Sequence, residues 1–451
     1  MTGAGVEFAD RYLQGLHADN VTRETHRVKV AGTRTFLVGR NAVCRYVRGT
    51  MSAQPAPSAA RRVNLRTPEV MEAVQAVVET HYHSMLVERL KDAGGVMRFG
   101  DVTVHLAKQF GFCYGVERAI DLAYAARKVF ADRNIFLIGE IIHNPEVNGQ
   151  LAAMGIRTLP GRGPTVDLSG LTPEDVVIIP AFGAEVSVQE RIKATGCAVV
   201  DTTCGDVMSV WKRVRQYAND GVTSIIHGKA DHEETRATSS RARSSAGEGH
   251  FVVVYDLTEA DAVCDYIRGR GDRAAFLEKF AGACSEGFDP DLHLGKVGVA
   301  NQTTMLRSET EEVQRRIREA VVARDGDDGN FRVFDTICGA TQERQDALLE
   351  MLRQPPDLML VIGGYNSSNT THLADMAAAK TPTYFVRNAS CLESSGTIRH
   401  FDTHRQVEIS TEGWMPEGPV KLGLTAGASC PGNLIEDVLR RFLELRGISV
   451  S

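Results

Sequence analysis

The chain has 451 residues, of which 43% are hydrophobic and 24% are charged, and its formal net charge is −6. This composition is typical of a globular protein and lacks the basic excess that binding to nucleic-acid phosphates requires. No apolar run approaches the roughly 18 residues of a membrane span. A chain of this length is expected to form about three domains.

The N-terminal part is expected to be an extension without a targeting role. Residues 1–20 carry acidic side chains and lack the apolar core of an export signal, so we expect a cytoplasmic protein. Residues 52–60 are typical of a linker, and residues 67–92 have the apolar periodicity of one helix. Nine cysteines in such a chain are expected to be reduced thiols or metal ligands.

Strand and helix patterns alternate from residue 101 onward. The apolar periodicity of helices follows Cys113 and Cys204, and a shorter match follows Cys338. Alternation of strands and helices predicts parallel sheets, whose ligands bind at the carboxyl ends of the strands. The charged, glycine-rich stretch 268–293 is expected to be an irregular surface insertion. Short apolar runs typical of parallel strands buried on both faces occur at 135–138, 222–226 and 358–362.

Three cysteines share one local context. Cys113, Cys204 and Cys338 each follow an apolar run and precede a glycine-containing turn and a helix. The second and third contexts nearly coincide, as Asp-Thr-Thr-Cys-Gly and Asp-Thr-Ile-Cys-Gly. A polar cluster recurs at a similar distance after each cysteine. The repeat predicts three α/β units whose cysteine-bearing ends converge on one point.

Three converging thiolates would bind a metal centre. An iron–sulfur cluster held by three thiolates leaves one iron free for substrate, much as a catalytic zinc keeps one open position. Zinc sites usually draw on Cys-x-x-Cys pairs, which this chain lacks. The alternative for any single cysteine is a small buried apolar side chain. That interpretation is kept for Cys44, Cys197, Cys264, Cys284, Cys391 and Cys430.

The polar clusters suit a phosphorylated ligand, because backbone N–H groups, hydroxyls and imidazoles bind phosphate oxygens. The alternatives are a helix N-cap for the Asn-Ser-Ser-Asn motif at 366–369 and a half-buried structural side chain for His143. Glu234, close to His232, is the candidate proton donor, because a dry site raises the pKa of a carboxyl group. The clusters occupy residues 140–145, 227–235, 301–304, 363–370 and 425–429.

Taken together, these motifs resemble the 4-hydroxy-3-methylbut-2-enyl diphosphate reductase family over about residues 101–439. The stretches 90–106, 112–118 and 341–346 are similar to its plant and cyanobacterial branch. The matching motifs are Gly-Phe-Cys-Tyr-Gly-Val at 111–116, Ile-His-Asn at 142–144, Asp-Thr-Thr-Cys at 201–204, His-Glu-Glu at 232–234, Gln-Thr-Thr at 302–304, Asn-Ser-Ser-Asn at 366–369 and Thr-Ala-Gly-Ala-Ser at 425–429.

The resemblance implies three pseudo-threefold-related α/β domains in a trefoil around one central [4Fe-4S] cluster, plus the N-terminal extension. It implies reductive removal of the substrate hydroxyl to give isopentenyl and dimethylallyl diphosphates, the last step of the methylerythritol phosphate route to isoprenoids. A donor such as ferredoxin or flavodoxin would supply electrons to a monomer or homodimer. The expected boundaries are 1–95 for the extension and 96–203, 204–335 and 336–451 for the domains, the last with a C-terminal loop and helix.

The resemblance also implies a role for each motif residue. Cys113, Cys204 and Cys338 would hold the cluster, and Glu234 would donate a proton with Thr303 in its relay. The diphosphate would be bound by His143, His232, Thr303, Ser367, Ser368, Asn369 and Ser429. The chain departs from the family at Phe182, where many bacterial members have a histidine, at Gly205 in place of proline, and at Cys430.

Two other functions fit the same cysteines. One is a [4Fe-4S] dehydratase of the quinolinate-synthase type, which would use the open iron as a Lewis acid without net electron transfer. The other is a non-catalytic iron–sulfur or zinc sensor whose N-terminal extension binds a partner. The combination of His232, Glu234 and Thr303 favours an enzyme, because a sensor needs no proton relay.

Overall fold

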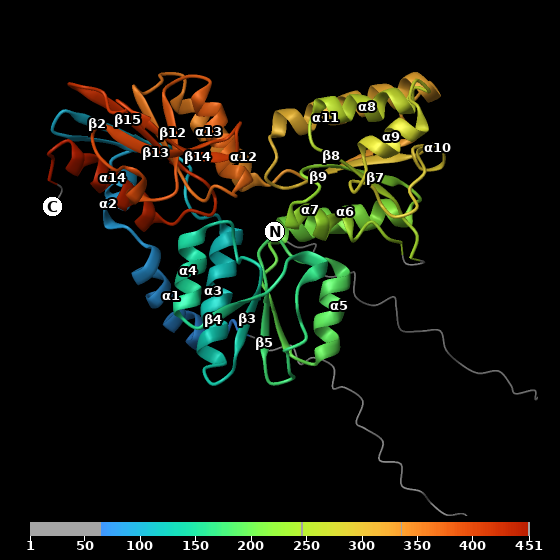
Figure 1. Ribbon diagram of the computed structural model, residues 1–451, viewed down its shortest axis with the longest axis horizontal. Helices are drawn as coiled ribbons and strands as arrows, with labels where there is room; N and C mark the ends of the chain where they lie inside the picture. Colours follow the sequence, from blue (N-terminus) through green and yellow to red (C-terminus); the bar gives the residue numbers. More distant parts are fainter. Residues whose placement is uncertain (1–64, 245–246, 335, 450–451) are drawn as a thin grey trace, which may run out of the picture. The chain divides into compact units, whose positions relative to one another are not determined.

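The computed structural model describes residues 65–244, 247–334 and 336–449 (Figure 1). The expected linker at 52–60, Cys44 and the first 64 residues of the expected extension lie outside the described residues. The described part contains three sheets that are packed with helices, together with a separate two-stranded ribbon, and it confirms the predicted α/β class. None of the helices described has both the length and the apolar character needed to cross a membrane.

The first sheet is parallel throughout and has the strand order β4-β3-β5-β6. Its strands are β3 (Ile135–Ile138), β4 (Ile156–Leu159), β5 (Val176–Ile179) and β6 (Ala198–Asp201). The helices of this unit are α3 (Tyr114–Val129), α4 (Pro145–Ala153), α5 (Val186–Thr195) and the 3₁₀ helix η1 (Gly163–Thr165). All residues of β5 are buried, as expected for a central parallel strand with helices on both faces.

The second sheet is also parallel, in the order β10-β9-β7-β8. Its strands are β7 (Thr223–His227), β8 (Phe251–Val254), β9 (Val297–Asn301) and β10 (Phe331–Val333). Figure 1 shows α8 and α11 on one face of this sheet and α6 on the other. The helices are α6 (Gly205–Asn219), α7 (Glu233–Ser239), α8 (Leu257–Ile267), α9 (Arg273–Lys279), α10 (Pro290–His293) and α11 (Arg307–Asp325).

The third sheet has the order β1-β2-β15-β11-β12, with β1 antiparallel to β2 and the other pairs parallel. Its strands are β1 (Val96–Phe99), β2 (Val102–Leu106), β11 (Leu358–Ile362), β12 (Thr383–Val386) and β15 (Val420–Ala426). An antiparallel pair, β13 (Thr397–Asp402) and β14 (Val407–Glu412), forms a separate ribbon. The helices are α12 (Gly339–Met351), α13 (Ser368–Ala378), α14 (Gly432–Leu445) and the 3₁₀ helix η2 (Ala389–Cys391).

Strand β2 lies in the third sheet, so the expectation that it opens the first domain is wrong. Its residues pair in parallel with β15, with Val102 opposite Val420 and Leu106 opposite Leu424. Alternating burial along β2 fits any sheet with one covered face, and the pattern alone does not identify the partner strand. The third unit therefore takes in strands that precede Cys113, while the boundaries expected at 203/204 and 335/336 stay predictions.

The helix expected over 67–92 is two helices, α1 (Pro68–Tyr82) and α2 (Met85–Asp92). The break occurs because Ser84 caps α2, its hydroxyl accepting a hydrogen bond of 3.0 Å from the N–H of Val87. Tyr82 packs into the core around α3, and Leu90 packs into the core of the third sheet. The C-terminal part of the expected extension is thus built into the folded core.

The stretch 268–293 is a packed element, so the expectation of an irregular surface insertion is wrong. It contains α9 and α10, and three phenylalanines, Phe276, Phe280 and Phe288, are buried in the core of the second unit. Charged residues and glycines dominate its composition, so these widely spaced apolar side chains form no clear pattern in the sequence.

We expect Phe280→Ala to lower the free energy of unfolding by about 3–5 kcal/mol, because Phe280 is only 1% exposed and its loss leaves a cavity. The matched control is Leu292→Ala in α10, which is 74% exposed and should change stability by less than about 0.5 kcal/mol. Denaturant unfolding measures both. Equal, small effects would contradict the packed position of α9.

Candidate active site

One cavity of about 110 Å³ is lined by every residue predicted for the site. Loops from all three units contribute to it. The predicted residues in its lining are Cys113, His143, Cys204, His232, Glu234, Thr303, Cys338, Ser367, Ser368, Asn369 and Ser429. Side chains separated by more than 300 residues in the sequence therefore face one small space.

Each of the three cysteines is the N-cap residue of a helix. Cys113 precedes α3, Cys204 precedes α6 and Cys338 precedes α12, all with extended backbone angles. The first turn of a helix has unpaired N–H groups and the positive end of the helix dipole, which together favour a nearby anion. These positions suit thiolates, which are the anionic ligands of a metal centre.

Gly115, in the first turn of α3, lies beside the sulfur atoms of Cys113 and Cys204. A Cβ at Gly115 would lie 2.5 Å from Sγ of Cys204 and 3.9 Å from Sγ of Cys113. The absence of a side chain at Gly115 therefore leaves room for the Cys204 thiol. The thiol of Cys338 donates a hydrogen bond of 3.0 Å to the carboxylate of Asp206, two residues after Cys204.

Burial opposes ionisation of these thiols. It raises the pKa of Cys338 to about 12, assisted by the hydrogen bond to Asp206, and it raises the pKa of Cys204. Backbone N–H groups of the following helices act in the opposite direction on both thiols. A bound metal centre would supply the positive charge that such buried thiolates need, so the donor set fits a metal cluster.

Glu234 is a buried carboxyl group held by one residue. The N–H of Thr303 donates to Oε1 at 2.6 Å, and its hydroxyl donates to Oε2 at 3.1 Å. Burial raises the pKa of Glu234 to about 7, although the two hydrogen bonds from Thr303 lower it. Glu234 can therefore carry a proton near neutral pH at the wall of the cavity.

His232 is oriented as a donor toward the cavity. Its Nδ1 accepts a hydrogen bond of 3.2 Å from the N–H of Glu234, so the neutral ring carries its proton on Nε2. Burial holds the pKa of His232 well below its usual value, which keeps the ring neutral. Among the described residues, Nε2 has no hydrogen-bond partner.

Two further buried nitrogens of the cavity lining lack a hydrogen-bond partner within the described part of the chain: Nε2 of His143 and Nδ2 of Asn369. The amide of Asn369 is fixed because its oxygen accepts from the N–H of Ala428 at 3.0 Å. Leaving a buried donor unsatisfied costs about 1–3 kcal/mol. An anion in the cavity would satisfy these groups at once.

Binding of a metal cation by His143, His232 and Glu233 is disfavoured. Nitrogen atoms of His143 and His232 and a carboxylate oxygen of Glu233 lie within 4.8 Å of one another, as in some metal sites. The Nε2 of His232 carries its proton, however, because Nδ1 is already an acceptor. A protonated nitrogen does not coordinate a metal, so the arrangement favours an anion.

The three serines of the cavity lining also make hydrogen bonds within the protein. Ser367 caps α13, where its hydroxyl oxygen accepts from the N–H of Thr370 at 3.4 Å, so the helix-cap interpretation is correct for this residue. The hydroxyl of Ser429 donates to the carbonyl oxygen of His143 at 3.1 Å. Ser368 accepts from Gln302 at 3.3 Å, which joins loops of the second and third units.

The departures from the family pattern have separate explanations. Phe182 stacks on the ring of His143, with centroids 4.7 Å apart and planes at 11°. A side chain at Gly205 would have open space, so glycine is not required there. Cys430 is fully buried in the core of the third unit and is absent from the cavity lining, which agrees with its structural interpretation.

No site role was predicted from the sequence for several residues that shape the cavity. Gly115 and Asp206 lie beside two of the cysteines, and each follows its cysteine by two residues. Asn144 donates to the carbonyl oxygen of Ser429 at 2.8 Å while its own oxygen caps α4. Asparagine before proline is a typical helix start and could have indicated this cap.

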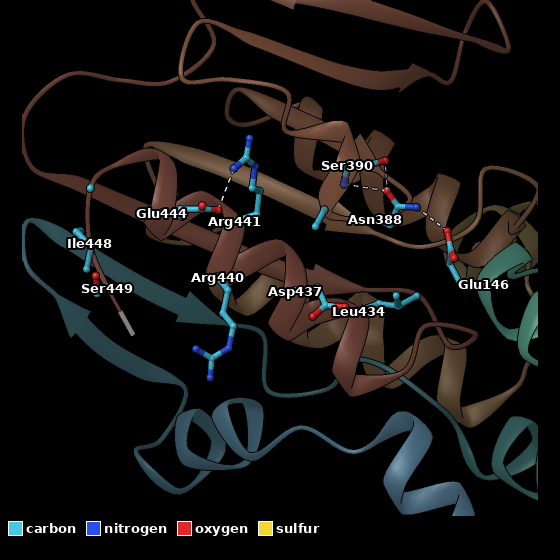
Figure 2. A pocket seen from close by; sticks show the side chains of 12 residues that line it. Glu146, Asn388, Ser390, Leu434, Asp437, Arg440, Arg441, Glu444, Ile448 and Ser449 are labelled. Atoms are coloured by element: carbon cyan, nitrogen blue, oxygen red, sulfur yellow. Dashed lines mark hydrogen bonds and ion pairs between the residues drawn. The ribbon is translucent and has the colours of Figure 1, made fainter. Parts of the chain in front are cut away.

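A larger hollow of about 800 Å³ lies over α14 and is a poor alternative (Figure 2). Its charged and polar side chains bond to one another, as Asn388 does to Glu146 at 2.5 Å and Arg441 to Glu444 at 2.9 Å. None of the buried unpartnered polar atoms found in the described residues belongs to its lining. The small cavity is therefore the better candidate.

Comparisons with known proteins agree with these features. A family model described as LytB protein matches residues 104–443. A 4-hydroxy-3-methylbut-2-enyl diphosphate reductase from Thermosynechococcus vestitus is 46% identical over 382 residues, which is 84% of this chain and 93% of that protein. A protein of the same name from Gloeobacter violaceus is 46% identical over 386 residues, 84% of this chain and 91% of that protein.

A solved structure has a similar fold. It is the E-1-hydroxy-2-methyl-but-2-enyl-4-diphosphate reductase from Plasmodium falciparum, with a TM-score of 0.55 and 20% sequence identity. The similarity covers 75% of this chain and 86% of that chain. At this level of identity the comparison supports the architecture of the sheets alone.

Proposed function

The chain belongs to the LytB protein family, and we propose that it is a 4-hydroxy-3-methylbut-2-enyl diphosphate reductase. The reaction removes the allylic hydroxyl as water, with two electrons and two protons, and gives isopentenyl and dimethylallyl diphosphates. The observation that carries this proposal is the small cavity where three thiols, a buried carboxyl group with a raised pKa and unpartnered N–H donors meet. The proposal includes a cytoplasmic enzyme and a ferredoxin or flavodoxin as electron donor.

We assign Cys113, Cys204 and Cys338 to one [4Fe-4S] cluster per chain. Three helix N-termini and the room that Gly115 leaves for the Cys204 thiol support this assignment. When bound, the cluster would supply electrons and an iron position open to an oxygen ligand.

We assign the unpartnered donors to the diphosphate. The Nε2–H of His232 and the amide of Asn369 would donate to phosphate oxygens, and Nε2 of His143 is a further unpartnered nitrogen in the same cavity lining. The first turn of α13, which begins after Ser367, would add backbone N–H groups. Serine hydroxyls at 367, 368 and 429 complete this side of the cavity.

We assign Glu234 to proton delivery. Its carboxyl group would protonate the departing hydroxyl, so that water leaves in place of hydroxide. Thr303 would hold the carboxyl group in position and return a proton to it through its hydroxyl. A non-catalytic sensor has no use for this pair, and a dehydratase of the quinolinate-synthase type would consume no electrons, which an assay can distinguish.

The proposed reaction is tested by anaerobic purification and an assay of the hydroxymethylbutenyl diphosphate with a strong chemical reductant. Consumption of two electrons per molecule of product would support the proposal. Turnover without reductant would support the dehydratase, and an intact cluster without turnover would support the sensor.

Gly115→Ala should reduce the iron and sulfide content of the purified protein severalfold. The added methyl group occupies a position 2.5 Å from Sγ of Cys204 and must displace that sulfur. Gly149→Ala is the matched control, because Gly149 is also helical and has no atom within 4 Å of the new Cβ. Its cluster content should equal that of the wild type. Equal cluster content in both variants would argue against the three-thiolate site.

Asn369→Ala should raise KM about tenfold or more, because a hydrogen bond to a charged group contributes about 1.5–3 kcal/mol. Its kcat should change much less. Asn388→Ala, outside the cavity, is the control and should leave KM unchanged. An Asn369→Ala enzyme with normal KM and reduced thermal stability would show that the residue is structural.

Glu234→Gln should lower single-turnover rates by about 10²–10⁴-fold, because the amide cannot donate a carboxylic proton. In the wild type the protonated form is active, so the rate should be highest below about pH 7 and fall as the pH rises through that value. The variant should lose this pH dependence. A Glu234→Gln enzyme with the wild-type rate would exclude Glu234 as the donor.

A further inference from the structure

The imidazole of His143 is held on two sides. At its edge, Nδ1 lies 3.1 Å from Oε2 of Glu140, three residues earlier in the same loop. On its face, Phe182 stacks at 4.7 Å. The opposite edge, Nε2, lies 3.9 Å from Oε2 of Glu233 and has no hydrogen-bond partner within the described residues.

Glu140 also contacts the third unit. The amide nitrogen of Asn366 donates to the same Oε2 at 2.7 Å. Asn366 immediately precedes the Ser367, Ser368 and Asn369 side chains that line the cavity. The loops approach closely here, since a Cβ at Gly364 would lie 2.4 Å from the carbonyl oxygen of His143. One carboxylate oxygen thus joins two separate parts of the proposed diphosphate site.

The chemistry of Glu140 suits this position. Burial raises its pKa, yet the hydrogen bonds from His143 and Asn366 leave it below the usual value for glutamate, so the side chain is ionised. A carboxylate can only accept, and it therefore holds a proton on Nδ1 of His143. The carboxylate thereby fixes the orientation of the imidazole ring, with Nε2 at the edge opposite the hydrogen bond.

We propose that Glu140 is a positioning residue for diphosphate binding, which orients His143 and ties it to the loop that begins at Asn366. The inference rests on the proposed function. It has added weight in this chain because Phe182 stands where many bacterial relatives have another histidine, so His143 and His232 are the two imidazoles in the cavity lining of the described residues.

A double-mutant cycle tests the proposal on the holoenzyme, with calorimetric binding of inorganic pyrophosphate and with KM and kcat. Glu140→Gln preserves the shape of the side chain but removes its charge. We expect about a tenfold rise in the pyrophosphate Kd and in KM, with kcat changed less than about threefold. In a His143→Gln background, the same substitution should change Kd less than about twofold. Glu140→Asp should recover part of the affinity.

Glu146→Gln is the matched control. Glu146 also joins the first unit to the third, through Asn388, but lines the other hollow and not the cavity (Figure 2). Its substitution should leave Kd unchanged. If Glu146→Gln weakens binding as much as Glu140→Gln, or if the Glu140 and His143 effects are fully additive, positioning of His143 is excluded.

Two further outcomes are informative. If Glu140→Gln does not fold, Asn366→Ala removes the other contact to the same oxygen, and unchanged pyrophosphate binding in that variant would overturn the proposal. Wild-type protein that binds pyrophosphate but does not reduce the diphosphate substrate would contradict the proposed function, while the binding cycle would still test Glu140.

Discussion

Convergence of three helix N-termini on one small space is the constraint on which the rest of the site depends. Helices α3, α6 and α12 each begin at a cysteine, so each thiol lies at the positive end of a helix dipole. The close packing leaves no room for a side chain at Gly115. Burial raises the pKa values of the Cys204 and Cys338 thiols, so their thiolates are unfavourable without a compensating positive centre. The proposed cluster would provide it.

The polar side chains of the cavity lining are also buried at a cost in free energy. His232 and Asn369 present N–H groups that have no hydrogen-bond acceptor among the described residues, while burial raises the pKa of Glu234 to about 7. His232 accepts a hydrogen bond from the N–H of Glu234, Asn369 accepts one from the N–H of Ala428, and Glu234 accepts one from the hydroxyl of Thr303. These side chains are therefore set in position before a ligand arrives, which reduces the cost of ordering the site on binding.

Much of this arrangement could be predicted from the sequence because it repeats. The three cysteine contexts and the polar loops after them predicted the α/β class and brought together the residues that line the cavity. The partner of β2 could not be predicted, since its alternation does not specify which strand lies beside it. The core position of Phe280 and the contact between Glu140 and Asn366 likewise depend on tertiary packing between segments far apart in the sequence.

In the proposed site, three thiols would hold a four-iron cluster with one iron open to substrate. Mössbauer spectroscopy of anaerobically purified, iron-57-labelled protein tests this arrangement most directly. We expect one iron of the four to differ from the others, and only its signal to shift when the hydroxymethylbutenyl diphosphate is added. Four equivalent irons that do not respond to this ligand, or a protein that contains zinc in place of iron, would contradict it.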